Sequence, residues 1–118
     1  MIVVFKNPPI GEENPKLTTE KRYVVIGIDD AFFRVIDDDS EPILYPKGYF
    51  ETVDSSIPTD WIRMDHPDGE YHIDPPECSA IGFYEDYFDD KEYAQEAFRR
   101  ATKRILSQLE ILGDASKK

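Results

Sequence analysis

The sequence contains a single cysteine, Cys78, and no long run of apolar residues. One cysteine excludes an internal disulfide, and residues 1–16 lack a cationic stretch followed by a long apolar one. We therefore expect a cytoplasmic protein without a signal peptide. The longest apolar runs are four to six residues, far short of the roughly 20 that span a bilayer. The sequence predicts a soluble protein without membrane contact.

Cations are also scarce, because 14 Lys and Arg face 25 Asp and Glu for a net charge of −11. Direct binding to DNA or RNA is not expected, since it depends on cations that displace phosphate counterions. The imbalance is uneven: residues 54–92 carry −10, residues 1–53 carry −4 and residues 93–118 carry +3. Such a concentrated field either attracts a cationic partner, for which a basic protein is expected, or belongs to a solvated acidic face that keeps the protein soluble. The oligomeric state and the organism stay open.

The 118 residues, 40% of them hydrophobic and 13% aromatic, are enough for one domain over 1–118 with a compact core. Alternating apolar residues between acidic turns predict a β-rich segment over 22–74, after a loop over 11–20. Gly27 marks a bulge or bend, and Lys47-Gly48 starts a helical turn. Strands are expected at 2–5, 22–28, 32–36, 43–45 and 49–53, with a hairpin that pairs 61–65 with 70–74.

The C-terminal part predicts an amphipathic helix over 90–112, capped by Asp89 or Asp90 and stopped by Gly113. Its apolar face is expected to cover the open side of the sheet. The fold class is therefore α+β: a small bent antiparallel sheet or SH3-like barrel closed by this helix. The apolar stripe comprises Tyr93, Ala94, Ala97, Phe98, Ala101, Ile105, Leu106, Leu109 and Leu112.

The sequence contains no recognisable catalytic, cofactor-binding or metal-binding motif. The acidic run 37–41 lacks the EF-hand glycine and glutamate, because Pro42 and Gly48 occupy those positions, so it predicts a hairpin turn. Five possible metal ligands fall within fourteen positions, without the spacing of a metal motif: Asp65, His66, His72, Asp74 and Cys78. We therefore expect no metal, no cofactor and no catalytic residue.

The densest mixture of aromatic and acidic residues is the phrase GFYEDYFDD at 82–90. In one interpretation its rings dock the last helix and its acids face solvent. In the other, Tyr84, Glu85, Asp86 and Asp89 form an exposed surface that recognises a basic, Arg-bearing partner. Trp61 is expected to anchor the core or, alternatively, to contribute to partner binding.

Two phrases, YVVIGIDDAFFRVIDDDSEPILYPKGYFETVD and GFYEDYFDD, resemble small bacterial cytoplasmic proteins of uncharacterised or immunity-type function with an SH3-like barrel. The resemblance covers about residues 22–90. It implies a non-enzymatic binding protein, in the immunity or antitoxin style, whose segment 84–90 blocks a basic effector such as a toxic nuclease. Two alternatives stay open. One is a metal-dependent or His-based enzyme using His66, His72 and Asp74, and the other is a peptide-binding SH3-like regulatory module exposing Tyr45, Tyr49 and Trp61.

Overall fold

The computed structural model describes residues 1–11 and 14–116, and side chains within 1–11 and 14–108. The chain divides into two compact units, a first unit over Met1–Asp74 and a second unit over Pro75–Lys118. The physical basis of this division is that strands pair with strands in the first unit, while helices contact helices in the second. The fold class is α+β, with a bent antiparallel sheet and a C-terminal helix.

The first unit holds a seven-stranded antiparallel sheet, with β1 (Ile2–Phe5) and β2 (Arg22–Asp29) separated by the predicted loop. The hydrogen-bonded order is β4-β3-β2-β1-β5, and β7 also pairs with β2 and with β6. The predicted hairpin over 61–65 and 70–74 is confirmed by β6 and β7. The remaining elements are β3 (Phe32–Ile36), β4 (Pro42–Pro46), the 3-10 turn η1 (Lys47–Tyr49), β5 (Phe50–Asp54), β6 (Ile62–Asp65) and β7 (Tyr71–Asp74).

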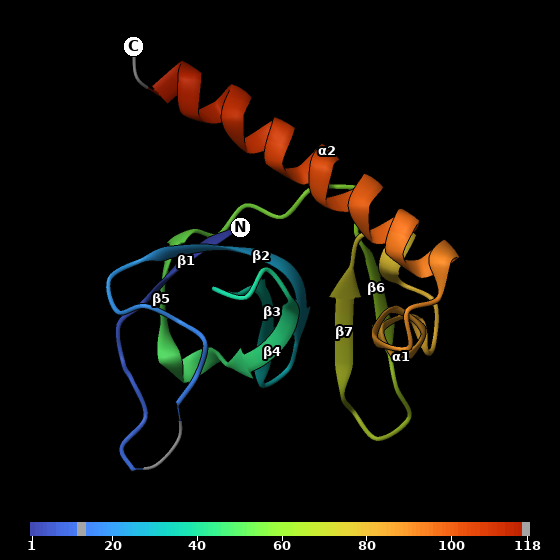
Figure 1. Ribbon diagram of the computed structural model, residues 1–118, viewed down its shortest axis with the longest axis horizontal. Helices are drawn as coiled ribbons and strands as arrows, with labels where there is room; N and C mark the ends of the chain where they lie inside the picture. Colours follow the sequence, from blue (N-terminus) through green and yellow to red (C-terminus); the bar gives the residue numbers. More distant parts are fainter. Residues whose placement is uncertain (12–13, 117–118) are drawn as a thin grey trace. The chain divides into compact units, whose positions relative to one another are not determined.

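The long strand β2 organises the sheet, because it pairs with three others. Its first residues pair with β1, and Ile28 lies between Phe33 of β3 and Ile73 of β7. The register shifts between Val25 and Gly27, which confirms the predicted irregularity at Gly27. A bulge bends the strand that carries it, and the ribbon of β2 is visibly curved in Figure 1.

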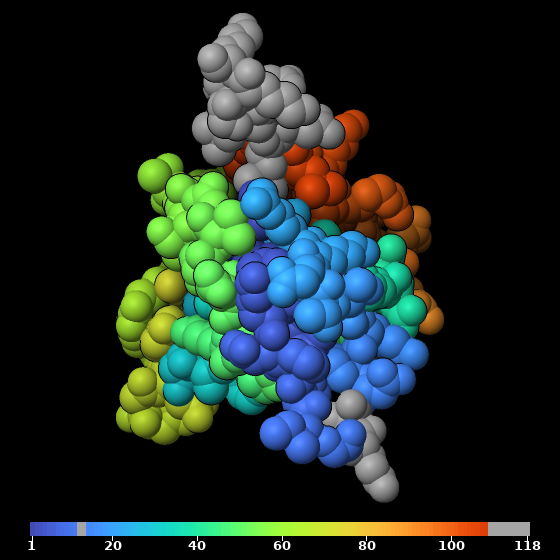
Figure 2. All heavy atoms as spheres, turned by 90° about the vertical axis from the view of Figure 1, so that its left-hand side faces the viewer, coloured from blue at the N-terminus to red at the C-terminus, as the bar shows by residue number. Residues whose placement is uncertain are grey.

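The sheet stays open. Among the described residues β4 ends one side of the strand order and β5 ends the other, and the two do not pair. β5 pairs with β1 from Phe50 opposite Phe5 to Asp54 opposite Ile2, and Figure 2 shows the blue surface of β1 beside the green surface of β5. A bent antiparallel sheet is thus confirmed, whereas hydrogen bonds do not close it into a barrel.

The acidic run forms the predicted hairpin turn between β3 and β4. The buried Asp37 carboxylate accepts the backbone N–H of Asp39 at 2.9 Å and of Glu41 at 3.1 Å, and the Tyr45 hydroxyl at 2.9 Å. Ser40 completes the turn at a φ of 60°. The carboxylates here satisfy backbone donors, as Asp does in turns.

The second unit consists of the 3-10 turn η2 (Pro76–Cys78), the short helix α1 (Phe83–Phe88) and the long helix α2 (Glu92–Ser116). Within this unit α2 contacts α1 and η2. The separate helix α1 was not predicted. The rings of Tyr84 and Tyr87 lie 6.5 and 4.8 Å from that of Phe98, which places α1 against α2.

The long helix begins two residues after its predicted start and ends four residues after its predicted end. The residue before the helix is Lys91 and not an aspartate. The Lys91 carbonyl accepts the first helical hydrogen bonds, from the N–H groups of Ala94 and Gln95. Asp89 instead ends α1, and Asp90 adopts a φ of 60°. The helix also continues through Gly113 to Ser116, because glycine costs a helix only about 1 kcal/mol and no proline follows.

The predicted apolar stripe of α2 is confirmed in its centre, where five residues are buried: Ala94, Ala97, Phe98, Ala101 and Ile105. It is wrong at Tyr93 and Leu106, which are 59% and 43% exposed. The side chains of Leu109 and Leu112 lie outside the described ones. That this stripe covers the open side of the sheet stays a prediction.

Candidate functional site

One face of α1 carries exposed acids around an exposed ring. Residues three and four apart share a helix face, so Glu85 lies beside Phe88 and Asp89. All three are exposed, and Phe88 retains 45% of its accessible surface. We call these three residues the α1 surface. This surface differs from both interpretations drawn from the sequence, because Phe88 was expected to dock in the first and was not part of the recognition surface in the second.

Two of the predicted recognition residues are engaged elsewhere. Tyr84 is half-buried, with its ring 5.1 Å from Phe83 in an edge-on arrangement. Asp86 is also half-buried and accepts a hydrogen bond from the Tyr93 hydroxyl. This hydrogen bond raises the pKa of Tyr93. Tyr84 and Asp86 therefore hold α1 in place, and the α1 surface keeps Glu85 and Asp89 from the predicted set.

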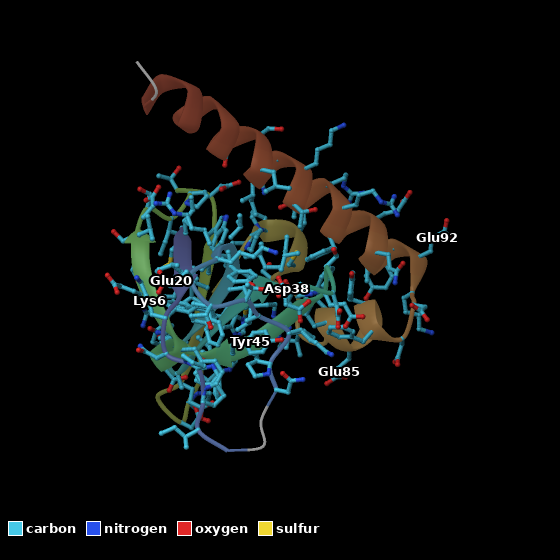
Figure 3. The ribbon with its side chains drawn as sticks, turned by 60° about the vertical axis from the view of Figure 1, so that its left-hand side comes forward. Lys6, Glu20, Asp38, Tyr45, Glu85 and Glu92 are labelled. Atoms are coloured by element: carbon cyan, nitrogen blue, oxygen red, sulfur yellow. The ribbon has the colours of Figure 1, made fainter. Side chains whose placement is uncertain are left out.

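The neighbours of the α1 surface along the chain extend the same chemistry. Ile81 is 86% exposed and Tyr93 is 59% exposed. Figure 3 shows Glu85 on α1 and Glu92 at the beginning of α2, and both side chains are exposed. Within the described part of the chain, neither Glu85 nor Asp89 forms a salt bridge. Their charges are therefore available to an outside cation.

The predicted aromatic face of the sheet is not formed as expected. Trp61 and Tyr45 are only 8% and 9% exposed, and Tyr49 is half-buried. The burial of Trp61 agrees with its interpretation as a core anchor. The indole N–H of Trp61 has no hydrogen-bond partner among the described residues. A peptide needs exposed rings to bind, so the burial of Tyr45 and Trp61 argues against the peptide-binding alternative.

Two histidines meet across the hairpin of β6 and β7. Nε2 of His66 lies 2.9 Å from Nδ1 of His72, and the ring centres are 4.8 Å apart. Both residues are half-buried. Burial lowers the pKa of His72, and the neighbouring His66 acts in the same direction. The contact requires an N–H on one ring and a lone pair on the other, so the two rings cannot both be imidazolium.

The sequence placed His66 and His72 among possible ligands without pairing them. The signal for their contact was the predicted hairpin itself. Once 61–65 pairs with 70–74, position 66 follows one strand and position 72 lies in the other, so both approach the same end. The observed register, with Met64 opposite His72 and Ile62 opposite Asp74, places 62, 64, 66, 72 and 74 on one face.

Asp74 is the buried carboxylate of this face, and burial raises its pKa to about 6 against the opposing influence of Arg34. Its Oδ2 lies 3.8 Å from Nε2 of His72. Gly27 makes room for it, because a Cβ on Gly27 would lie 2.7 Å from Asp74 Oδ1. The bulge in β2 and the carboxylate at the end of β7 therefore depend on the same glycine.

The arrangement limits the available chemistry. Within 1–11 and 14–116, no group of three or more His, Cys, Asp or Glu side chains is placed to hold a metal ion. Cys78, the fifth possible ligand, is buried in η2 of the second unit. Asp65 pairs with Arg63 at 3.0 Å. Of the five possible ligands, only His66, His72 and Asp74 lie together on one face of the hairpin.

A search of the described residues finds no helix long and apolar enough to cross a membrane. Comparisons with known proteins matched no family model, no curated protein and no solved structure.

Proposed function

We propose that this protein is a non-enzymatic, acidic binding module that blocks a basic effector protein through the α1 surface. In this proposal it acts in the cytoplasm, in the manner of an immunity or antitoxin protein. The observation that supports it is the exposure of Glu85 and Asp89 on either side of Phe88, with no internal salt bridge among the described residues.

The composition of the α1 surface matches the chemistry of protein recognition. Aromatic residues and arginine are enriched at binding interfaces, and an Arg guanidinium both pairs with carboxylates and stacks on rings. Phe88 offers apolar area, while Glu85 and Asp89 offer charge at its two sides. A partner that presents arginines around an apolar residue would satisfy both. The basic active site of a nuclease is one such surface.

Packing favours a preformed binding surface. Tyr87 contacts Phe98 of α2 and Phe88 of its own helix, with ring centres 4.8 and 5.1 Å apart. The Nε2 of Gln95 donates to the carbonyl of Tyr87 at 3.3 Å and to the Asp90 carboxylate at 3.1 Å. Because α1 is fixed at these points, its conformational entropy is already lost on folding. Binding of a partner therefore does not require α1 to become ordered.

The fold proposed for the first unit is an SH3-like barrel left open between β4 and β5. Its support is the shared strand β2, the bulge near Gly27 and the 3-10 turn that links β4 to β5. The proposed kinship with small bacterial immunity-type proteins rests on the two sequence phrases that carry the resemblance.

The test compares two charge reversals of equal size. Glu85→Lys/Asp89→Lys reverses the charge of the α1 surface, and Glu41→Lys/Glu51→Lys reverses two exposed acids of the first unit. Tagged forms of both and of the native chain are used to retain proteins from the source cell at low salt, and the retained protein is then purified and titrated by calorimetry.

We expect a basic protein to bind the native chain and the control with equal affinity, and the α1 variant at least about tenfold more weakly, since a close interfacial charge pair couples by about 1.5 kcal/mol or more. Equal binding by the two reversals would contradict the proposal. So would the absence of any stoichiometric basic protein in the native sample.

A further inference from the structure

The inner face of the β6–β7 hairpin carries a pair of nitrogen ligands that the proposed function does not use. His66 and His72 are the only histidines in the chain, and their nearest ring nitrogens are 2.9 Å apart. Such a coincidence is informative because histidine is the commonest metal ligand in proteins. The contact joins the residue that follows β6 to a residue of β7, and the hydrogen bond from the His66 N–H to the Glu70 carbonyl at 2.8 Å continues the backbone pairing to His66.

We propose that His66 and His72 bind one divalent late transition-metal ion, with Cu²⁺ as the preferred ion. The ligand atoms are Nε2 of His66 and Nδ1 of His72, and water fills the other positions. This site lies in the first unit, whereas the α1 surface belongs to the second. The proposed metal site can therefore be tested independently of the proposed function.

The nitrogen spacing suits two adjacent coordination positions. Metal–imidazole bonds of about 2.0–2.1 Å at a right angle separate the two nitrogens by roughly 2.8–3.0 Å. The observed 2.9 Å is the N···N distance of the hydrogen bond in the metal-free pair, and a turn of the rings at this spacing brings both nitrogens to adjacent positions of a square or tetragonal complex. That geometry is typical of Cu²⁺ and Ni²⁺, and Cu²⁺ stands highest in the order of affinities for nitrogen sites.

Binding requires a lone pair on each of the two facing nitrogens. In the metal-free pair, one of them carries the proton of the N–H···N hydrogen bond. On binding, that proton moves to the other nitrogen of the same ring, and both rings turn so that their lone pairs converge on the ion. Where the ring is His72, the proton comes to Nε2, which lies 3.8 Å from the Asp74 carboxylate. A carboxylate beyond a ligating imidazole orients the ring and raises its basicity.

The surroundings favour a cation on this face. Asp29 is aligned with His72 between β2 and β7, and Asp74 follows His72 two residues later on the same face. Arg63 of β6 and Lys47 of η1 lie on the opposite face of the hairpin, 4.2 and 5.7 Å from the centre of the Tyr71 ring. Arg34 and Asp74 both approach Gly27. Across the whole chain the charge of −11 attracts divalent ions.

The experiment titrates Cu²⁺ into the untagged chain and follows binding by calorimetry and by electron paramagnetic resonance. Because the chain has two histidines, His66→Ala and His72→Ala each leave one imidazole. We expect one equivalent to bind the native chain with two equatorial nitrogens, and each variant to lose at least about tenfold in affinity and one nitrogen coupling, since the second ligand binds intramolecularly.

Asp68→Asn/Glu70→Gln, in the turn of the same hairpin, serves as the matched control for unspecific binding by acids, and we expect it to keep the native affinity. Circular dichroism confirms folding, and His66→Gln replaces His66→Ala if the latter unfolds. The proposal is overturned if a single-histidine variant binds Cu²⁺ as tightly as the native chain. It is equally overturned if the native chain binds no more tightly than His66→Ala/His72→Ala, or if only one nitrogen couples.

Discussion

The two units of this protein build their interiors from different residues. The sheet of the first unit buries large and branched side chains, with Val3, Val25 and Val35 at 0% exposure and Ile26 at 2%. The described helices of the second unit bury three alanines, Ala94, Ala97 and Ala101, alongside Phe83, Phe98 and Ile105. Because hydrophobic stabilisation grows with buried apolar area, we expect the second unit to open more readily. Binding surfaces are often drawn from such regions of lower local stability.

The largest expected effect is that of a core truncation in the sheet. Ile26→Ala removes a side chain that is 2% exposed, and we expect it to lower the free energy of unfolding by about 3–5 kcal/mol. Ile105→Ala, on α2, is expected to cost about 2–3 kcal/mol and to speed amide exchange in α2 while β2 stays protected. Urea unfolding and hydrogen exchange measure both. Equal loss of protection in both units after either change would show that they unfold as one.

The next effect concerns the close approach at Gly27. Gly27→Ala would place a Cβ 2.7 Å from Asp74 Oδ1 and 3.3 Å from the Cβ of Arg34, and overpacking of this kind costs about 1–3 kcal/mol. Gly48→Ala is the matched control in η1, because nothing lies within 4 Å of its Cβ. Urea midpoints compare them. If Asp74→Ala restores part of the Gly27→Ala loss in a double-mutant cycle, the clash with the carboxylate is its cause.

A smaller effect is expected at the turn between β3 and β4. Tyr45→Phe removes the hydroxyl that donates to the buried Asp37 carboxylate at 2.9 Å, and a hydrogen bond to a charged acceptor contributes about 1.5 kcal/mol or more. Tyr71→Phe is the control, since the Tyr71 hydroxyl only accepts a long contact of 3.4 Å from Lys47. Thermal unfolding of both variants checks the difference. Identical midpoints would assign no stabilising role to the Tyr45 hydroxyl.

The smallest effect is expected in the second unit. Arg104 Nη2 lies 2.6 Å from Glu77 Oε1, with side chains 31% and 22% exposed. Because the pair is partly solvated, Arg104→Gln is expected to cost no more than about 1 kcal/mol, and less as salt increases. Arg100→Gln changes an exposed residue of the same helix as control. A salt-independent loss in thermal unfolding would assign the effect to packing of the arginine stem instead.

The sequence predicted the sheet well because its signals are local. Acidic turns separate the apolar runs, and these runs correspond to β2, β3 and the β6–β7 hairpin within one or two residues. The capping residue of the last helix was predicted less well than the strands. Asp89 and Asp90 resemble caps in sequence, yet α1 forms before them and uses Asp89 at its own end. Whether a capping residue starts or ends a helix depends on contacts such as that of Tyr87 with Phe98, which no local pattern contains.

The candidate sites show the same limit. Exposed acids at Glu85 and Asp89 follow from composition, because charged residues seldom lie in a core. The engagement of Asp86 by Tyr93 required the turn between α1 and α2, which the sequence did not predict. The meeting of His66 and His72 required the strand register in addition to the strands. The contacts between particular pairs of side chains could therefore not be predicted from the sequence.

The prolines of β4 have a consequence for how this protein behaves in a crowded solution. In the described sheet β4 is a terminal strand, and an exposed terminal strand can recruit the strand of another molecule through its free backbone groups. Pro42 and Pro46 stand at its two ends and carry no N–H to donate. Any intermolecular pairing along β4 is thus interrupted at both ends, so this edge resists aggregation although Leu44 at its centre is 39% exposed.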